Sequence, residues 1–588
     1  MDNLQTKDKV NNYQYFIEKS NDDKYIIKIK DLDKNNTFYI GSKYSVQRDI
    51  DKFIEQIKDF NVSTIFLVFG IGAGEHIVNL QKKIGEKNKI LVIEPDKKVI
   101  DCLKENSYYD EIIKDKRVWV SELNTDINHI LSSFVDEINI NNIKLMVFAN
   151  YDRIYESKFK EFYKKLNDFL LNNIINMNTN ISFSEQFFKC YINNLKCIFN
   201  SVLINEFRDK LKNIPAVIVS AGPSLEKNID LLREVTEKFV IVTGIRTVNS
   251  LKVRGISPDF VCAVDPSEEM YKVAEDSLDC KAPLLFCECT NYKIVKEYEG
   301  EKIFFQEGIN LKKVTPEILN VKVDPLWSGG SVAHTCTAFA RYMGCNPIIF
   351  IGQDFAYTYD KYHAESANKE NNNIINSDDT IFVESIDGGE VRTSKILDTY
   401  RKNMEDFIRV AKDTMFINST EGGSNIRGTK VQPLRNVIDE YSQKNNFNYE
   451  FEKIMNKFNG VNKVKVLEKI IQLSDNLEDL KEKCALALDY SNKFLDSYKT
   501  DNEINIKPLL DRTNEINNII YKIEFIENLL KPTIYRFLMN PEYIERMNET
   551  KEEMEYRLAR QVKDLYEGII KSIDESIPYV KECIEELN

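Results

Sequence analysis

The stretch Ile214-Pro-Ala-Val-Ile-Val-Ser-Ala-Gly-Pro-Ser-Leu225 is the part of the chain from which the fold can best be inferred. Its apolar run, Ala216–Val219, is typical of a buried strand. The small residues at 220–224 break this pattern, and from Leu225 onward the apolar spacing becomes helical. The sequence therefore predicts a strand, a tight turn and a helix, which is the repeating unit of an α/β sheet.

The turn in this stretch has the features of an anion site. Gly222 would let a ligand approach the backbone, and free N–H groups at a helix start attract negative charge. Ser220 and Ser224 add two hydroxyl donors. An ordinary strand-to-helix turn has the same pattern, so the turn alone leaves both interpretations open.

Length and composition restrict the classes of protein that remain. A chain of 588 residues with 43% apolar residues is long enough for several domains. A net charge of −13 argues against nucleic acid or an anionic membrane surface as a partner. With four histidines, a His-rich metal centre is not expected, and we predict no metal site.

The cysteines and the N-terminus indicate the compartment. The eleven cysteines show no paired C-x-x-C spacing, which favours reduced thiols. The first residues do not form a signal peptide, and no apolar run approaches the length of a membrane span. We therefore expect a soluble, cytoplasmic protein that is not inserted in a membrane.

Residues 1–154 are predicted to form a hairpin followed by a Rossmann-like domain. Alternation over residues 13–40 predicts the hairpin, and the apolar run at 64–69 leads into Gly70-Ile-Gly72-Ala-Gly74. Glu94 ends the next strand, where an acidic residue would bind a ribose. The same glycines resemble the first motif of S-adenosylmethionine-dependent methyltransferases. A purely structural turn is the alternative.

Two regions have helical character throughout. Residues 155–212 contain no proline or glycine, and we interpret them as a helical connector. Residues 432–588 carry three apolar stripes at helical spacing, over 467–488, 516–530 and 554–569. We predict a C-terminal helical bundle used for docking or for forming a homo-oligomer.

Residues 213–431 are predicted to form the central catalytic α/β domain. Several of its strands end in glycine, serine or an acid, and such ends meet at the ligand-binding edge of an open sheet. The pattern predicts a nucleotide-phosphate site, although neither a P-loop nor a Gly-x-Ser-x-Gly motif is present. The predicted binding residues are Ser220, Ala221, Gly222, Pro223, Ser224, Thr243, Gly244, Asp265, Ser328, Gly329, Gly330 and Ser331.

The segment after Asp354 holds the residues best suited to catalysis. His363 is predicted to act as a general base on a hydroxyl acceptor. Tyr357, Tyr359 and Tyr362 are predicted to donate hydrogen bonds to a departing phosphate, which needs no metal. Asp354 or Asp265 would bind a ribose, the acceptor or a divalent ion. A solvent-exposed polar loop is the alternative for this segment.

These motifs together resemble one family. Ser220-Ala-Gly-Pro-Ser-Leu225, Trp327-Ser-Gly-Gly-Ser331 and Gly352-Gln-Asp354 through His363, along with Ser257-Pro-Asp-Phe260 and Asp265-Pro266, resemble the motility-associated factor (Maf) flagellin glycosyltransferases over most of the chain. The resemblance implies transfer of a nonulosonic acid, such as pseudaminic or legionaminic acid, from a CMP-activated donor to flagellin Ser or Thr. Flagellin and the CMP-nonulosonate would be its partners, with no permanently bound cofactor.

The central domain is also similar to bacterial sialyltransferases, whose Gly-Asn-Gly-Pro-Ser-Leu turn binds CMP. Ser220-Ala221 stands here in place of that Gly-Asn pair. The similarity implies an inverting reaction without an obligatory metal, with His363 as base and the tyrosines on the leaving phosphate.

Two other functions remain open. The central domain resembles archaeal 6-hydroxymethylpterin diphosphokinases, which would use ATP and magnesium with Asp265 or Asp354 as ligands. A non-catalytic flagellin-binding assembly factor, acting through the helical bundle, is the third hypothesis. Strict dependence of activity on magnesium would indicate the diphosphokinase. Binding of flagellin without a change in its mass would indicate the assembly factor.

Overall fold

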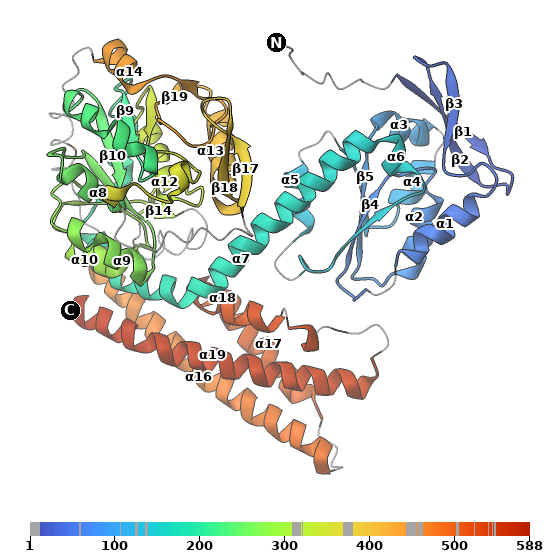
Figure 1. The fold of residues 1–588 in the computed structure, drawn as a ribbon. Helices are drawn as coiled ribbons and strands as arrows, with labels where there is room; N and C mark the ends of the chain where they lie inside the picture. The colour runs from blue at the N-terminus through green and yellow to red at the C-terminus, as the bar shows by residue number, and fades with distance from the viewer. Residues whose placement is uncertain are drawn as a thin grey trace. The chain divides into compact units, whose positions relative to one another are not determined.

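The computed structural model describes residues 12–57, 60–105, 108–123, 127–135, 139–307, 319, 321–367, 380–442, 454, 463–500, 505–522, 524–538, 540–543, 545 and 549–587 (Figure 1). The chain divides into two compact units. The N-terminal unit comprises Met1–Ser182, Leu488–Leu509 and Pro532–Leu565. The central unit comprises Phe183–Ala487, Leu510–Lys531 and Tyr566–Asn588. The predicted α/β fold class is confirmed.

The N-terminal unit begins with three antiparallel strands, β1 (Tyr13–Lys19), β2 (Tyr25–Asp31) and β3 (Asn36–Ile40). The predicted hairpin is the β2–β3 pair, and β1 adds a strand that the prediction did not separate. Tyr15 of β1 donates a hydrogen bond to Asp96 (2.7 Å) and contacts the Tyr155 hydroxyl (2.8 Å). These buried contacts fix the small sheet to the rest of the unit.

A parallel sheet of order β6-β5-β4-β7 forms the Rossmann-like part of this unit. All five residues of its central strand β4 are buried, as expected for a strand covered on both faces. The strands are β4 (Ile65–Phe69), β5 (Lys89–Glu94), β6 (Val118–Glu122) and β7 (Ile143–Val147). The helices are α1 (Val46–Glu55), α2 (Glu75–Lys83), α3 (Lys97–Glu105), α4 (Tyr108–Ile113), α5 (Ile127–Phe134) and α6 (Tyr151–Ile154).

The glycine-rich turn after β4 is filled by a side chain of the protein itself. A Cβ atom on Gly70 would lie 2.3 Å from the Tyr151 ring. The Gly72 N–H donates to the Tyr151 hydroxyl (2.9 Å), which donates in turn to the Glu94 carboxylate (2.8 Å). Burial raises the pKa of Glu94 to about 8. These contacts favour the structural interpretation of the turn over the cofactor-binding one.

The central unit contains a nine-stranded parallel sheet of order β20-β19-β16-β9-β10-β11-β12-β13-β8. From β9 the chain adds strands up to β13 on one side and then continues with β16 on the other side, so the strand order reverses between β9 and β16. The strands are β8 (Val202–Leu203), β9 (Ala216–Val219), β10 (Val240–Gly244), β11 (Phe260–Ala263), β12 (Leu284–Phe286), β13 (Lys302–Phe304), β16 (Ile348–Ile351), β19 (Phe416–Asn418) and β20 (Lys430–Val431).

Further elements surround this sheet. The helices are α8 (Ile245–Lys252), α9 (Glu268–Ala274), α10 (Tyr292–Glu297), α12 (Val332–Tyr342), α13 (Lys395–Val410) and α14 (Leu434–Tyr441). A hairpin of β17 (Thr380–Glu384) and β18 (Glu390–Ser394) and a parallel pair of β14 (Gln306–Glu307) and β15 (Pro325–Leu326) complete it. Residues 366–379 are rich in Asn, Ser and Asp, and this composition predicts a mobile surface insertion; except for 366–367 they lie outside the described residues.

Two expectations differ from the structure. The predicted connector 155–212 contains helix α7 (Glu156–Phe199), but it also contains β8, the edge strand of the central sheet. The helix expected from Leu225 is instead two 3₁₀ helices, η2 (Pro223–Lys227) and η3 (Ile229–Glu234). Asn228 separates them because it leaves helical geometry (φ −132°, ψ 0°), and its amide donates to the Ser419 carbonyl (2.8 Å).

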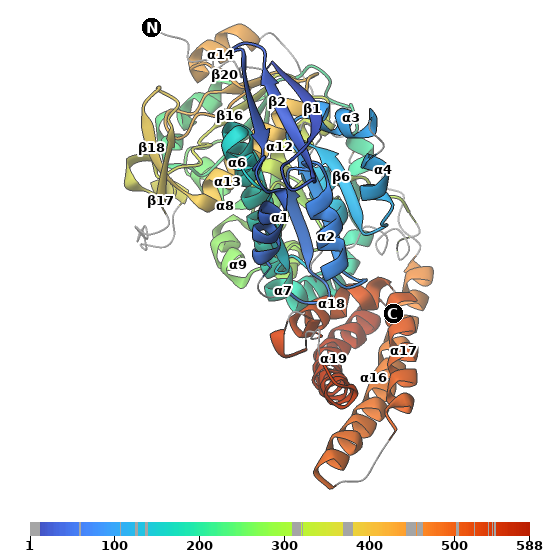
Figure 2. The same cartoon turned by 90° about the vertical axis from the view of Figure 1, so that its right-hand side faces the viewer.

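The C-terminal region is helical, as predicted, and its helices contribute to both units. The helices are α16 (Lys463–Thr500), α17 (Lys507–Lys522), α18 (Glu524–Leu538) and α19 (Lys551–Leu587). Helices α16 and α19 pair in antiparallel fashion: Lys581 contacts Glu478 in the central unit, and Ser491 donates to the Ala559 carbonyl in the N-terminal unit (Figure 1 and Figure 2).

None of the described helices combines the length and the apolar character that a membrane span requires. All eleven cysteines are free thiols, in keeping with the expectation from their spacing.

The Tyr151 contact in the N-terminal unit yields a stability prediction. Tyr151→Phe removes the hydroxyl that joins Gly72 to Glu94, so two buried polar groups lose a partner. We expect the unit to lose about 1–3 kcal/mol of unfolding free energy. Urea unfolding followed by the fluorescence of Trp119, in a Trp327→Phe background, measures this. Tyr163→Phe on the exposed face of α7 is the control and should change little; equal losses in both variants would contradict the argument.

Candidate functional site

The candidate site lies where the strand order of the central sheet reverses, at the carboxyl ends of β9 and β16. Open α/β sheets bind ligands at this position because the loops of the two strands diverge there. Here the two loops are joined by hydrogen bonds. Ser220 donates through its hydroxyl to Gln353 (2.6 Å), and the Gly222 N–H donates to the Gly352 carbonyl (2.8 Å).

Asp354 holds the turn at 220–224. Its side chain is 2% exposed, and its two carboxylate oxygens accept from the Ser224 hydroxyl (2.5 Å) and the Ser224 N–H (3.1 Å). Burial raises the pKa of Asp354, while the hydrogen bonds from Ser224 and Thr358 lower it. The Asp354 carbonyl also accepts from the N–H of Ser424 (2.8 Å) in the loop after β19. Asp354 therefore joins three loops, two of them through its carboxylate and the third through its backbone carbonyl.

Gly222 is required by the approach of the loop after β16. A Cβ atom there would lie 2.4 Å from the Gly352 carbonyl oxygen and 2.5 Å from the Asp354 carboxylate. Pro223 follows as the first residue of η2 and is buried. The sequence predicts that a ligand approaches the backbone at Gly222. In the structure, Gly352 and Asp354 fill part of that space.

The start of α8 lies beside the start of α12. A Cβ atom on Gly244, the N-cap of α8, would lie 2.8 Å from the Val332 side chain at the start of α12. Thr243 is buried, and its hydroxyl donates to the Val219 carbonyl (2.9 Å), so it serves the sheet. Two helix starts, each with backbone N–H groups that favour an anion, therefore border the same region of the site.

His363 returns from the loop after β16 to the turn after β9. The neighbouring Ala364 N–H donates to the Ala221 carbonyl (2.8 Å). Burial and the nearby Arg246 guanidinium on α8 lower the pKa of His363 to about 4, against a smaller opposing effect of a backbone hydrogen bond with Ala221. The imidazole is therefore neutral at physiological pH and has a nitrogen lone pair available to accept a proton.

The three tyrosines separate into a pair and a single residue. Tyr357 and Tyr362 have ring centroids 5.6 Å apart, and the Tyr362 ring lies 4.7 Å from that of His363. Tyr359 is 58% exposed and lies under the ammonium group of Lys227, 4.9 Å from its ring centroid. The structure thus brings Tyr357, Tyr362 and His363 together and places Tyr359 against η2.

The segment 328–331 leads into α12 and contacts a histidine that the sequence analysis missed. Ser331 is 2.7 Å from His334 Nδ1, and His334 Nε2 is 2.9 Å from the Tyr400 carbonyl. A carbonyl can only accept, so Nε2 carries the proton. Burial lowers the pKa of His334 to about 4, which keeps the ring neutral. Nδ1 therefore accepts the Ser331 proton.

This hydrogen bond limits what Ser331 can offer a ligand. A hydroxyl has one proton to donate, and His334 accepts it, so the Ser331 oxygen presents lone pairs. Such an atom suits a ribose or sugar hydroxyl better than a phosphate oxygen. The spacing of one helical turn between Ser331 and His334 was the sequence signal that would have found this pair.

Helix α13 supports the segment 328–331 from outside. Asn403 donates to the Gly329 carbonyl (3.0 Å), and a Cβ atom on Gly330, where φ is +98°, would lie 2.6 Å from the Tyr400 ring. Asp265 lies in the loop after β11, where one carboxylate oxygen accepts from the Ser267 N–H (2.8 Å). In the described part of the chain, no three potential metal ligands converge.

Comparisons with known proteins bear on the fold. The family model described as 6-hydroxymethylpterin diphosphokinase MptE-like matches residues 189–360. No curated protein matches the chain. Among solved structures, the Maf glycosyltransferase from Magnetospirillum magneticum AMB-1 matches with a TM-score of 0.58 and 14% identity, over 97% of this chain and 93% of that one. This chain has the Maf glycosyltransferase fold.

The Maf likeness extends over nearly the whole chain, whereas the MptE-like match is confined to the central unit and the end of α7. The resemblance drawn from the sequence motifs is thus confirmed at the level of the fold. The Ser220 turn, the Ser331 segment and His363 occupy one edge of the central sheet of this Maf fold.

The two hydrogen bonds from Ser224 to the Asp354 carboxylate, here called the Asp354 clamp, can be tested directly. Asp354→Asn leaves one acceptor oxygen for the two Ser224 donors, so either the Ser224 hydroxyl must turn and accept from the amide NH₂, losing its present bond, or two donors face each other. We expect a loss of about 1–3 kcal/mol in the unfolding free energy of the central unit. Urea unfolding followed by Trp327 fluorescence, in a Trp119→Phe background, measures it. Asp265→Asn keeps the single acceptor that Ser267 needs and should be close to neutral; the reverse order of effects would refute the clamp.

Proposed function

We propose that this protein is a glycosyltransferase that moves a nonulosonic acid from a CMP-activated donor to Ser or Thr of flagellin. The observation that carries the proposal is the meeting of a neutral His363, Arg246 and the 220–224 turn where the strand order reverses. This arrangement offers a proton acceptor beside a positively charged, anion-favouring region. The solved protein with the same fold is named a glycosyltransferase.

The residues have distinct roles in the proposed reaction. The starts of α8 and α12, with Arg246, bind the CMP phosphate, and Ser331 accepts a hydrogen bond from a donor hydroxyl. His363 takes the proton of the acceptor hydroxyl while that oxygen attacks the anomeric carbon. The bond from this carbon to the phosphate oxygen breaks, and CMP leaves with the bonding electrons. Tyr357 and Tyr362 donate hydrogen bonds to the departing phosphate.

Electrostatics couples the base to the donor. A histidine with a pKa of about 4 is a weak base at neutral pH. A bound CMP phosphate would offset the field of Arg246 at the imidazole and raise its pKa. His363 would therefore become a stronger base when the donor is bound, at the stage of the reaction where it must take the proton of the acceptor hydroxyl.

The diphosphokinase hypothesis has one specific observation in its favour, the MptE-like match over residues 189–360. It would need ATP and magnesium held by Asp354 or Asp265. Both carboxylate oxygens of Asp354 already accept from Ser224, whereas among the described residues only one oxygen of Asp265 accepts a hydrogen bond. Asp265 is thus the better metal ligand of the two, and strict dependence of activity on magnesium would favour this function.

The main test is the intact mass of flagellin co-expressed with this protein and a CMP-nonulosonate pathway. We expect a mass increase of whole sugar units, and purified components should retain transfer in EDTA. His363→Ala should abolish the increase while CMP binding, measured by calorimetry, stays within about threefold, because the base contributes to chemistry rather than donor affinity. His129→Ala, an exposed histidine of the N-terminal unit, is the control and should keep full transfer.

Other outcomes would overturn the proposal. Flagellin that co-purifies without any mass increase would favour a binding or assembly factor. A His363→Ala protein that is folded but loses both transfer and CMP binding would show that the histidine is structural.

The influence of Arg246 on His363 gives a pH prediction. Arg246 lowers the pKa of His363, so Arg246→Gln should raise it from about 4 toward the ordinary value of 6.5. The imidazole would then become protonated at a higher pH, and the acidic limb of the activity profile would move upward. NMR titration of the four histidines, with His363→Ala for assignment, measures the pKa directly. Arg246→Lys keeps the charge and should leave it low; equal values in both variants would exclude the charge effect.

A further inference from the structure

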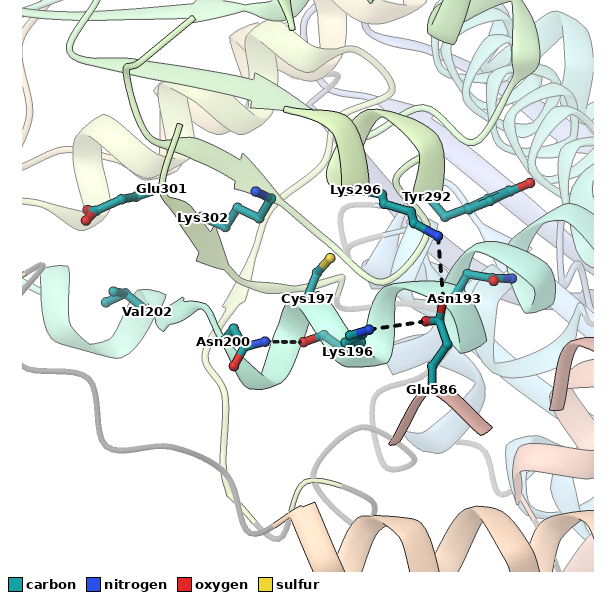
Figure 3. Close-up of a pocket in the computed structure, with 10 residues that line it drawn as sticks. All are labelled: Asn193, Lys196, Cys197, Asn200, Val202, Tyr292, Lys296, Glu301, Lys302 and Glu586. Carbon is teal, nitrogen blue, oxygen red and sulfur yellow. Dashed lines mark hydrogen bonds and ion pairs between the residues drawn. The ribbon is translucent and has the colours of Figure 1, made fainter. Parts of the chain in front are cut away.

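A pocket of about 430 Å³ lies in the central unit, at the sheet edge opposite the candidate site (Figure 3). Val202 and Lys302, the first residues of β8 and β13, line it. It therefore lies at the amino ends of these strands, whereas the candidate site lies at carboxyl ends. The last turn of α7, helix α10 and the end of α19 complete its wall.

Two lysines of this pocket face a single carboxylate. In Figure 3 the amino groups of Lys196 and Lys296 point toward Glu586 near the end of α19. The distances are 4.0 Å from Lys196 and 3.5 Å from Lys296, both longer than a close ion pair. One carboxylate thus serves two ammonium groups, and neither contact has the geometry of a strong hydrogen bond.

A third lysine has no acidic partner. Lys302 donates to the backbone carbonyls of Tyr298 (2.9 Å) and Gly300 (3.4 Å). Among the described residues, no carboxylate oxygen lies within 4.0 Å of its amino group. Burial in the pocket lowers the pKa of Lys302. Its positive charge is solvated by neutral carbonyls. The pocket is lined by three lysines and two acids, Glu586 and Glu301, so its lysines outnumber its acids by one.

We propose that this pocket binds the phosphate group of a small organic molecule, and that Glu586 occupies part of the site when the molecule is absent. A phosphate carries more charge than a carboxylate and presents more oxygens, so it can satisfy several lysines together. The pocket is larger than a phosphate needs, and the Val202 side chain, the Cys197 thiol and the Tyr292 ring provide less polar wall for an organic group. A nucleotide and a sugar phosphate share this chemistry.

The thiol of Cys197 gives a measurement confined to this pocket. It is half-buried and free, so its alkylation by N-ethylmaleimide can be followed by peptide mass spectrometry on the full chain. We expect CMP or a hexose phosphate to slow this reaction fivefold or more in a saturable way. The rate at Cys280, another half-buried thiol of the central unit, should not change. The probe that protects at the lowest concentration identifies the class of organic group.

Variants test the charge argument. Lys196→Ala with Lys296→Ala should raise the half-protecting concentration about tenfold or more, as expected for losing two charged contacts to phosphate. Glu586→Gln removes the competing carboxylate and should lower that concentration about threefold. Glu299→Gln is the matched control because Glu299 also pairs with a lysine, Lys281, but does not line the pocket. It should have no effect.

Three results would overturn the proposal: no protection by any probe at millimolar concentration, equal protection by sulfate, or equal effects of Glu586→Gln and Glu299→Gln. The readout requires neither flagellin nor transfer. Failure of the proposed transferase would therefore leave the expected protection unchanged, and failure here would leave the transferase proposal intact.

Discussion

The buried hydrogen bonds between Asp354 and Ser224 are the constraint on which the candidate site depends. They join the loops after β9 and β16, and the Asp354 backbone carries the same connection to the loop after β19. A buried carboxylate is costly unless it is hydrogen-bonded, so these contacts favour one arrangement of the three loops. His363, Tyr357 and Tyr362 follow directly in the chain, and their positions rest on this junction.

The two parallel sheets show why a glycine-rich turn does not by itself define a ligand site. After β4, the Tyr151 ring occupies the space beside Gly70 and its hydroxyl binds Gly72 and Glu94. After β9, the Asp354 carboxylate and the Gly352 carbonyl occupy the space beside Gly222. In both turns glycine is needed because another part of the same chain comes close.

Charge is distributed differently at the two edges of the central sheet. At the carboxyl edge, burial and the nearby Arg246 both lower the pKa of the proposed base His363, so its imidazole is neutral. At the amino edge, Lys196 and Lys296 share Glu586, and Lys302 donates to backbone carbonyls. Each edge thus has positively charged side chains that an anionic ligand would neutralise, although the net charge of the whole chain is −13.

The sequence by itself determined the α/β class, the positions of most strands along the chain and the helical C-terminal region, because buried strands and amphipathic helices leave local apolar patterns. It also selected the strand ends that meet at the site. Short edge strands such as β8 carry too few residues for such a pattern. Only the tertiary structure decided that Asp354 binds Ser224, 130 positions away in the chain, and that His334 lies between Ser331 and Tyr400. Hydrogen bonds between distant segments depend on how the sheet is assembled, and local spacing does not encode that assembly.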